Sequence, residues 1–338
     1  MMRVRPQTTP AASARGRGRP AAPLFAAVTG LLLLTACGSG GDTDRADDSK
    51  VSADVAGVHA AASQAAVPPK VTTGAVLDFD LIPAAGKTVG TGQPVSLEFE
   101  KPVKDKAAVE KALTVTASTP TEGSWGWVTT PSGHDRLDWR PKDPWKPGTD
   151  VTVKGTLTTV DPGGAHFDRD LERTFKIGRD QQLTADLDTH RLIVERDGKV
   201  VKSIPMSGGQ PVKGRQSRLG TYALKSREPK VHMTSASVGG PVDYDVTVNW
   251  GMRVTDTGAY IHEGVPEAQK YVGNTNHSAG CIGMTPADSK WLFDNTILGD
   301  LLTIKGQEAI KNADGPGNGY ADWSITYEDW KKLSKTTS

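Results

Sequence analysis

The sequence predicts a mainly β protein with two successive β-rich domains behind an N-terminal export signal. Short runs of alternating or β-branched residues, each bounded by glycine, proline or aspartate, recur from about residue 71 to residue 305. Only three short stretches have the composition of a helix. The chain of 338 residues is long enough to bury two hydrophobic cores, and the strand pattern divides near residue 178.

The first 36 residues have the composition of a lipoprotein signal peptide. A basic segment with five arginines and no acidic residue precedes the apolar run Ala21–Ala36, which is shorter than the roughly 20 residues of a transmembrane helix. The run ends in Leu34-Thr35-Ala36-Cys37, which resembles a bacterial lipobox. We expect a lipid such as palmitate on Cys37 to anchor the protein outside the cell membrane, facing the cell wall. The alternative is an ordinary secretory signal with a chance cysteine.

Residues 37–70 predict a disordered tether. They are poor in large apolar side chains, rich in Ala, Ser, Asp and Gly, and end in a proline pair. Removing the five arginines of the leader takes the formal net charge from +1 to −4, which gives no support to a nucleic-acid partner. The chain has two cysteines, so a lipidated Cys37 leaves Cys281 without a disulfide partner.

Residues 71–178 predict an immunoglobulin-like β-sandwich. One helical patch, Lys104–Ala112, interrupts the strand pattern. Four tryptophans in this region are expected in the core rather than on a ligand platform: Trp125, Trp127, Trp139 and Trp145. The expected strands are Val95–Val103, Leu113–Ser118, Asp150–Val160 and Arg173–Ile177.

Residues 179–306 predict a second β-rich domain. Asp197-Gly198 predicts a tight turn within the hairpin Leu192–Ile204. Thr285-Pro286 predicts the start of a helix, because threonine caps and proline suits the first helical position. Residues 307–338 are expected to form an extension with a short terminal helix, packed on this domain. Further strands are expected at Leu219–Leu224, Val246–Val254 and Leu301–Lys305, with a loop around Met233.

Cys281 is the candidate nucleophile, and His262 is the candidate base. A thiol reacts as the thiolate, so it needs a neighbouring group to take its proton. A strand that ends at His262 is followed by a polar loop that returns to Gly280-Cys281, which can bring the imidazole beside the sulfur. Gly280 permits unusual dihedral angles, and the amides around it and Cys281 are candidate oxyanion donors.

The same residues have three other interpretations. Cys281 could be a buried small apolar residue, since free cysteines are among the most buried residues. A zinc site of His262, His277 and Cys281 lacks a ligand-spaced pair and a fourth ligand. A papain-like peptidase has its cysteine early and its histidine far downstream, which is the reverse of the order here.

His262, fifteen further residues and then Ser278-Ala279-Gly280-Cys281 resemble the signature of the L,D-transpeptidases, a histidine followed after about fifteen residues by Ser/Thr-His-Gly-Cys. The resemblance extends from about residue 80 to residue 332. Residues 99–123 and 139–149 resemble the bacterial immunoglobulin-like domain of the mycobacterial enzymes, and residues 244–262 and 321–330 resemble their catalytic domain and C-terminal extension. The family fold is a β-sandwich that carries the cysteine in a tunnel under a lid hairpin.

The resemblance implies roles for several residues of this chain. Cys281 is then the nucleophile and His262 its base, while Glu263, a serine in the mycobacterial enzymes, orients the imidazole through its backbone carbonyl. Tyr244 and Met233 occupy positions of the substrate cavity wall and the lid region. The remaining substrate-binding positions are Ser278, His277, Asn276 and Trp250.

Two positions depart from the family pattern. The motif histidine two residues before the cysteine is Ala279, and the usual Asn or Arg two residues after it is Gly283. Either His277 takes the vacated place, or the position is dispensable, or the chain is a slow or substrate-shifted relative.

The implied function is the formation of 3→3 peptidoglycan cross-links through a Cys281 thioester, with release of D-Ala from a tetrapeptide stem. The partners are then stem peptides, as donor tetrapeptide and acceptor amine, with carbapenem β-lactams as inhibitors, and no metal or organic cofactor is required. An L,D-carboxypeptidase that uses the same residues, and a non-catalytic peptidoglycan-binding lipoprotein, are the alternatives.

Overall fold

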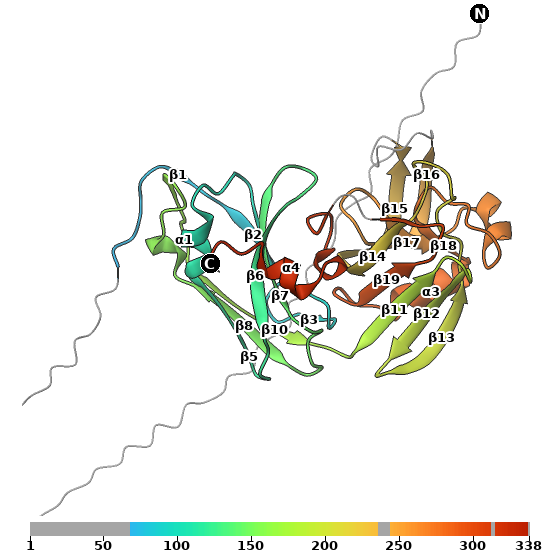
Figure 1. The fold of residues 1–338 in the computed structure, drawn as a ribbon, viewed down its shortest axis with the longest axis horizontal. Helices are drawn as coiled ribbons and strands as arrows, with labels where there is room; N and C mark the ends of the chain where they lie inside the picture. The colour runs from blue at the N-terminus through green and yellow to red at the C-terminus, as the bar shows by residue number, and fades with distance from the viewer. Residues whose placement is uncertain (1–67, 236–243, 312–314, 337–338) are drawn as a thin grey trace, which may run out of the picture. The chain divides into compact units, whose positions relative to one another are not determined.

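A computed structural model of the chain describes residues 68–235, 244–311 and 315–336 (Figure 1). The predicted signal peptide, Cys37, most of the predicted tether and the tip of the predicted lid hairpin lie outside these residues. The described part is mainly β, as the sequence predicts. None of its helices has both the length and the apolar composition needed to cross a membrane.

Two four-stranded sheets form the first domain. One sheet has the order β2-β4-β7-β6 and the other the order β3-β10-β8-β5, with a short helix between β4 and β5. A further two-stranded pair joins β1 to β9. The bounds are β1 Ala75–Val76, β2 Phe79–Ile82, β3 Thr88–Val89, β4 Val95–Phe99, α1 Lys106–Lys111, β5 Leu113–Ala117, β6 Gly123–Thr129, β7 Asp135–Pro141, β8 Asp150–Gly155, η1 Leu157–Thr159, β9 Ala165–His166 and β10 Leu171–Ile177.

Aromatic side chains fill the core of this domain, which confirms the interpretation of its four tryptophans. All four are buried. The Trp139 and Trp145 rings stack with centroids 5.0 Å apart, and Trp127 stacks on Phe99 at 5.6 Å. The Trp145 indole N–H donates to the backbone carbonyl of Gln93 at 2.8 Å, so its one polar atom has a partner inside the core.

The sequence analysis missed β6 and β7. Every residue of β7 is buried, including Arg136, Asp138 and Arg140, so the strand shows no alternation of apolar and polar residues. Arg136 Nε donates to the Asp138 carboxylate at 2.7 Å, which allows the two charges to be buried together. Strand prediction from periodicity fails where paired charges replace apolar side chains in the interior.

The second domain contains a six-stranded sheet of order β13-β12-β11-β19-β14-β20 and a four-stranded sheet of order β15-β16-β17-β18. Its main core lies among strands of both sheets and the helix α3. The bounds are β11 Gln181–Asp186, β12 Arg191–Arg196, β13 Lys199–Pro205, β14 Arg218–Ala223, β15 Ser226–Thr234, β16 Asp245–Arg253, β17 Tyr260–Glu263, η2 Pro266–Tyr271, β18 Ile282–Met284, α3 Pro286–Asp294, β19 Leu301–Lys305 and β20 Ile310–Lys311.

Local signals placed several of these elements correctly. Asp197 and Gly198 have φ values of 51° and 72°, the left-handed angles that a two-residue hairpin turn between β12 and β13 requires. Thr285 caps α3, because its hydroxyl oxygen accepts from the Asp288 backbone N–H at 3.2 Å. The strand predicted at Leu301–Lys305 is β19, which lies inside the sheet between β11 and β14.

The prediction of a loop around Met233 is wrong. Strand β15 runs through Met233 and pairs antiparallel with β16, with Met233 opposite Val246. Charged, proline and histidine residues dominate β15, and only Val231 and Met233 are buried. The apolar alternation is therefore too short to be read from the sequence, and pairing with β16 decides the conformation.

The C-terminal extension contacts both domains. Its elements are η3 Asp322–Ser324 and α4 Tyr327–Lys331. Ser324 Oγ donates to the Thr221 carbonyl of the second domain at 2.8 Å. The fully buried Trp330 donates its indole N–H to the Ser124 carbonyl of the first domain at 2.9 Å.

We expect Trp330→Ala to lower the free energy of unfolding by about 3–5 kcal/mol, because the substitution leaves a cavity where a buried indole packs. Urea denaturation measures this loss, with the exposed Lys332→Ala as control.

A substitution at Gly126 tests the same contact, since a Cβ atom there would lie 2.6 Å from the Trp330 ring. Gly126→Ala should destabilise the wild type more than it destabilises Trp330→Ala. Equal costs in the two backgrounds would contradict this contact.

Candidate active site

Parallel pairing of β17 with β18 brings the two predicted catalytic residues together. Ile261 pairs with Ile282 and His262 with Gly283, so Cys281 enters the sheet directly beside the strand that carries the histidine. Cys281 and His262 both line one cavity. The sequence order of histidine, loop and cysteine is therefore the order of two neighbouring strands joined by a loop that contains η2.

The turn before Cys281 is held by the Ser278 hydroxyl. Its oxygen accepts from the Gly280 N–H at 3.0 Å, and its proton is donated to the Cys281 carbonyl at 2.6 Å. Gly280 has a φ of 120°, which side-chain-bearing residues rarely adopt. A Cβ atom there would make only ordinary contacts, so the turn needs glycine for its backbone angles and not for space.

Ser217 holds the same turn from a second loop, and the sequence analysis missed it. This buried serine donates to the Gly280 carbonyl at 2.9 Å and accepts from the Gly209 N–H at 2.8 Å. It thereby ties the loop between β13 and β14 to the cysteine turn. No motif marks this position, because a serine in a polar loop has no distinctive sequence signal.

His262 is set up as a neutral base. Its Nδ1 donates to the Glu263 carbonyl at 2.6 Å, which leaves Nε2 as the acceptor nitrogen. The Glu263 carboxylate accepts from the Asn249 side-chain amide at 2.7 Å and so holds this residue in place. Burial lowers the pKa of His262, so the imidazole is uncharged at neutral pH.

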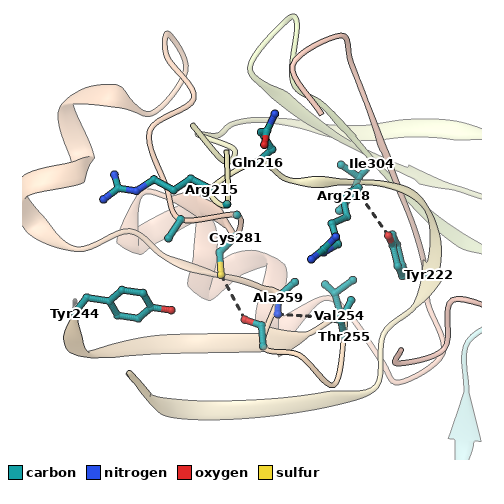
Figure 2. Close-up of a pocket in the computed structure, with 14 residues that line it drawn as sticks. Arg215, Gln216, Arg218, Tyr222, Tyr244, Val254, Thr255, Ala259, Cys281 and Ile304 are labelled. Carbon is teal, nitrogen blue, oxygen red and sulfur yellow. Dashed lines mark hydrogen bonds between the residues drawn. The ribbon is translucent and has the colours of Figure 1, made fainter. Parts of the chain in front are cut away.

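Cys281 is protonated at rest. Its Sγ donates to the Gly258 carbonyl at 3.7 Å (Figure 2). Burial raises the pKa of the thiol to about 11, and a backbone N–H from Tyr260 offsets only part of this effect. In the described part of the chain, Cys281 Sγ forms no hydrogen bond with the His262 ring. The resting site therefore holds a neutral thiol and a neutral imidazole, because burial penalises both charged forms.

The C-terminal extension fixes the carbonyl that accepts the hydrogen bond from the thiol. Gly258 lies in the turn between β16 and β17, and this turn is bound by the segment around Asn318. Asn318 accepts from the Thr257 N–H at 3.1 Å and donates to the Thr257 hydroxyl at 2.8 Å. The Asp256 carboxylate accepts from the Gly319 N–H at 3.0 Å. Residues far beyond the motif thus set the geometry of the sulfur's resting partner.

Two cavities meet at the thiol. A small cavity of about 90 Å³ extends past Gly258, Thr255 and Ile304, and a large cavity of about 380 Å³ extends past His262, Met233 and Tyr271. Four of the described residues line both cavities: Arg215, Tyr244, Ala279 and Cys281. One sulfur is therefore open to two separate spaces.

Tyr244 points its hydroxyl toward Cys281 (Figure 2). Burial, with a smaller contribution from the nearby Cys281, raises the pKa of this phenol. The hydroxyl therefore keeps its proton over the neutral range and remains a hydrogen-bond donor. Its place in both cavity walls agrees with the substrate role that the resemblance implies.

The large cavity contains three more of the predicted substrate-binding residues. Met233, Ser278 and His277 line it. The His277 ring stacks on Tyr271 with centroids 3.8 Å apart, and its Nδ1 lies 3.4 Å from the Gln210 side-chain nitrogen. His277 is held in the wall of the large cavity by these contacts.

Asn276 and Trp250 line neither cavity, which corrects their assignment to the substrate site. The buried Asn276 amide is used internally: it accepts from the Gly208 N–H at 2.9 Å and donates to the Leu187 carbonyl at 2.9 Å. Trp250 packs on Phe293 of α3, with ring centroids 5.5 Å apart. Both residues support the scaffold.

Ala279 and Gly283, where the chain departs from the family pattern, lie at the site itself. Ala279 lines both cavities, and Gly283 lines the large one. Gly283 exchanges two backbone hydrogen bonds with Ser207, at 2.8 and 2.9 Å. A Cβ atom at Gly283 would make only ordinary contacts, so the lack of a side chain widens the cavity and is not forced by packing. Within the described ranges, no group of three or more side chains suited to metal binding occurs.

Comparison with known proteins agrees with this geometry. Residues 180–304 match the family model of the L,D-transpeptidase catalytic domain, and residues 48–161 match that of a bacterial Ig domain. L,D-transpeptidase 1 of Mycobacterium tuberculosis is 31% identical over 246 residues, which cover 72% of this chain and 89% of the relative. The chain belongs to the L,D-transpeptidase family. L,D-transpeptidase 2 of the same species is 33% identical over 259 residues, 74% of this chain, but the match spans only 60% of that longer relative.

Solved structures show the same family fold. An LD transpeptidase in complex with imipenem matches 70% of this chain and 100% of its own, with a TM-score of 0.58 and 28% identity. An L,D-transpeptidase from Mycobacterium smegmatis matches 68% of this chain and 99% of its own, with a TM-score of 0.54 and 30% identity. These matches confirm the resemblance and the fold class that the sequence analysis inferred.

The protonated resting thiol leads to a prediction about alkylation. Iodoacetamide reacts with the thiolate, so its rate constant at Cys281 should rise about tenfold per pH unit from pH 7 to pH 10. No plateau is expected below the pKa of about 11. Intact mass spectrometry follows the reaction, and Cys281→Ser is the unlabelled control. A plateau between pH 6 and pH 8 would show a resting ion pair and contradict the neutral site.

Proposed function

We propose that this L,D-transpeptidase family member forms 3→3 cross-links between peptidoglycan stem peptides with Cys281 as its nucleophile. The observation that carries the proposal is that two cavities reach the same sulfur. A transpeptidase must bring an acyl donor and an amine acceptor to one atom in turn. Family membership, which rests on both the catalytic and the Ig-like domain, supports the same reaction.

In the first half-reaction, His262 Nε2 takes the thiol proton as Sγ attacks the carbonyl carbon of the third stem residue, a diamino acid. The attack requires Sγ to turn from the Gly258 carbonyl toward the imidazole, a rotation about one side-chain bond. Since the pKa of the thiol is raised and that of the imidazole is lowered, proton transfer is coupled to the attack. No stable ion pair precedes it.

The developing oxyanion needs donors that are not already in use. The Gly280 N–H donates to Ser278, which removes it from the set that the sequence suggested. We assign this role to the Cys281 backbone N–H and the Tyr244 hydroxyl. The phenol keeps its proton because burial raises its pKa.

The tetrahedral adduct then collapses to a thioester. The bond to the D-Ala nitrogen breaks, and this amine leaves with the proton that His262 acquired from the thiol. The side-chain amine of a second stem attacks the thioester carbonyl, His262 takes a proton from it, and Sγ is released as the thiol. Division into two acyl transfers replaces one amine attack on an unactivated amide with two easier steps.

Water that enters the acceptor cavity would hydrolyse the same thioester. Ala279 and Gly283 leave the walls around the sulfur with little or no side chain, which favours access. An L,D-carboxypeptidase outcome is therefore the second candidate. A peptidoglycan-binding protein without catalysis has no such support, since its site needs neither a nucleophile nor a base.

Carbapenem β-lactams are proposed inhibitors. A solved relative is described in complex with imipenem, and L,D-transpeptidase 3 of Mycobacterium tuberculosis carries a faropenem-derived adduct. A strained lactam carbonyl in the large cavity of this chain would acylate Cys281 as the stem carbonyl does. Since peptidoglycan lies outside the cell membrane, we propose that the enzyme acts there and that a lipid on Cys37 holds it at the membrane.

Purified protein with a disaccharide-tetrapeptide should give the cross-linked dimer and free D-Ala, measured by mass spectrometry. Cys281→Ala should abolish the reaction, and His262→Ala should lower its rate by about 10²–10⁴-fold, because the base is lost. The exposed Lys199→Ala serves as control. D-Ala release without dimer would select the carboxypeptidase. Turnover by Cys281→Ala would overturn the mechanism.

The anchor is tested in the bacterial cell. An alkyne analogue of palmitate should label the full-length protein, and Cys37→Ser should remove the label and release the protein from the membrane fraction. Cys281→Ser is the matched control and should stay labelled. Label that persists in Cys37→Ser would contradict lipidation at this cysteine.

A further inference from the structure

Of the residues that the structure describes, Arg215 is the one with a permanently charged side chain that lines both cavities. The four residues common to the two walls are this arginine, Tyr244, Ala279 and the nucleophile. In Figure 2 the Arg215 side chain extends away from Cys281 on the side of the view where Tyr244 lies. Neither the family signature nor the mechanism above uses this arginine.

The Arg215 side chain is held in place, yet its charge is not neutralised. Its Nη1 donates to the Gln210 side-chain oxygen at 2.8 Å, and the nitrogen of the same amide lies 3.4 Å from His277 Nδ1. No carboxylate of the described residues forms an ion pair with it. A guanidinium has five N–H donors, so four remain after the bond to Gln210.

The loop that carries Arg215 is tied to the nucleophile. Ser217, two residues later, donates to the Gly280 carbonyl, and the Arg215 N–H donates to the Val212 carbonyl at 3.0 Å. The backbone of Arg215 therefore keeps a fixed relation to the cysteine turn. A group bound by the guanidinium would therefore be held at a fixed position relative to the sulfur.

The charges of the two cavities favour an anion. Among the described residues that line the walls, the cations are Arg215, Arg218 and Lys270, and the only carboxylate is that of Glu267. None of the described residues that line the small cavity is acidic. A planar, always charged guanidinium in such surroundings suits a carboxylate, which it can bind through two parallel hydrogen bonds.

We propose that Arg215 binds the free carboxylate of the residue that leaves the donor stem. This inference rests on the proposed function and names the group that selects the donor. The leaving residue is an α-amino acid, so only one carbon separates its carboxylate from the nitrogen of the bond that breaks. A cation that lines both of the cavities that reach the sulfur is in place to bind it there.

Such a contact defines donor specificity. A stem with one residue after the scissile bond presents its carboxylate to Arg215. In a longer stem the corresponding carbonyl belongs to an uncharged amide, because the chain continues beyond it. The same holds for a bond within a longer peptide. The guanidinium then remains unpaired near an amide that cannot balance its charge, which lowers affinity for these stems.

Binding to the inert Cys281→Ala background tests the inference without turnover. Isothermal titration calorimetry should show the tetrapeptide binding about 10- to 100-fold more tightly than its C-terminal carboxamide, the range of a charge-assisted hydrogen bond. Arg215→Met should weaken tetrapeptide binding by the same factor and leave the carboxamide unchanged. Arg215→Lys should recover part of the loss, because it restores the charge but not the planar fork.

Two matched variants remove a cation from one wall only: Lys270→Met from the large cavity and Arg218→Met from the small one. Both should retain the preference for the free carboxylate. Loss of this preference in either variant, an equal loss for both ligands in Arg215→Met, or no preference in the starting background would overturn the inference. These results are independent of the dimer assay, so a failed assay with an intact Arg215-dependent preference would reject only the cross-linking reaction.

Discussion

The parallel pairing of β17 with β18 is the constraint on which the site depends. It fixes the strand that carries His262 against the strand that directly follows Cys281, and backbone hydrogen bonds hold the register. A shift of one residue would turn one of the two side chains to the opposite face of the sheet. Ser278 and Ser217 add to this constraint by fixing the turn that leads into β18. The reactive pair is therefore positioned by main-chain geometry.

Burial determines the chemistry of that pair. In a solvated site, an imidazole near a thiol would favour the charged pair, but here the removal of water disfavours both ions and the proton stays on sulfur. The hydrogen bond to Gly258 then gives the thiol a partner that is not the base. A protonated thiol of this kind reacts slowly with oxidants and electrophiles, because the thiolate is the reactive form.

The sequence was informative where local signals decide structure and uninformative where tertiary contacts do. Cys281, His262 and Gly280 could be named because a thiol, an imidazole and a glycine at this spacing have few structural explanations. The turn at Asp197-Gly198 and the cap at Thr285 follow from backbone preferences alone. In contrast, β7 buries charges that pair only in the folded protein, and β15 depends on its partner strand. Ser217 and Arg215 act through contacts between distant segments, which no single-sequence pattern records.

The assignments of Asn276 and Trp250 show the opposite limit. Both lie near the motif or in a matching stretch, yet their polar or aromatic groups are used inside the scaffold. Closeness along the chain to a catalytic residue does not indicate which way a side chain faces. Whether a given side chain lines the cavity can be determined only from the structure.

The hold of Asn318 and Gly319 on the turn around Gly258 has a consequence for biogenesis. The carbonyl that accepts the hydrogen bond from the thiol is held by a segment that follows the cysteine in the chain, so these contacts form only when that segment docks. A nascent chain that already contains the cysteine therefore lacks the finished pocket. A chain cut between Cys281 and Asn318 would therefore keep its nucleophile but lose the contacts that hold the thiol's resting hydrogen-bond partner.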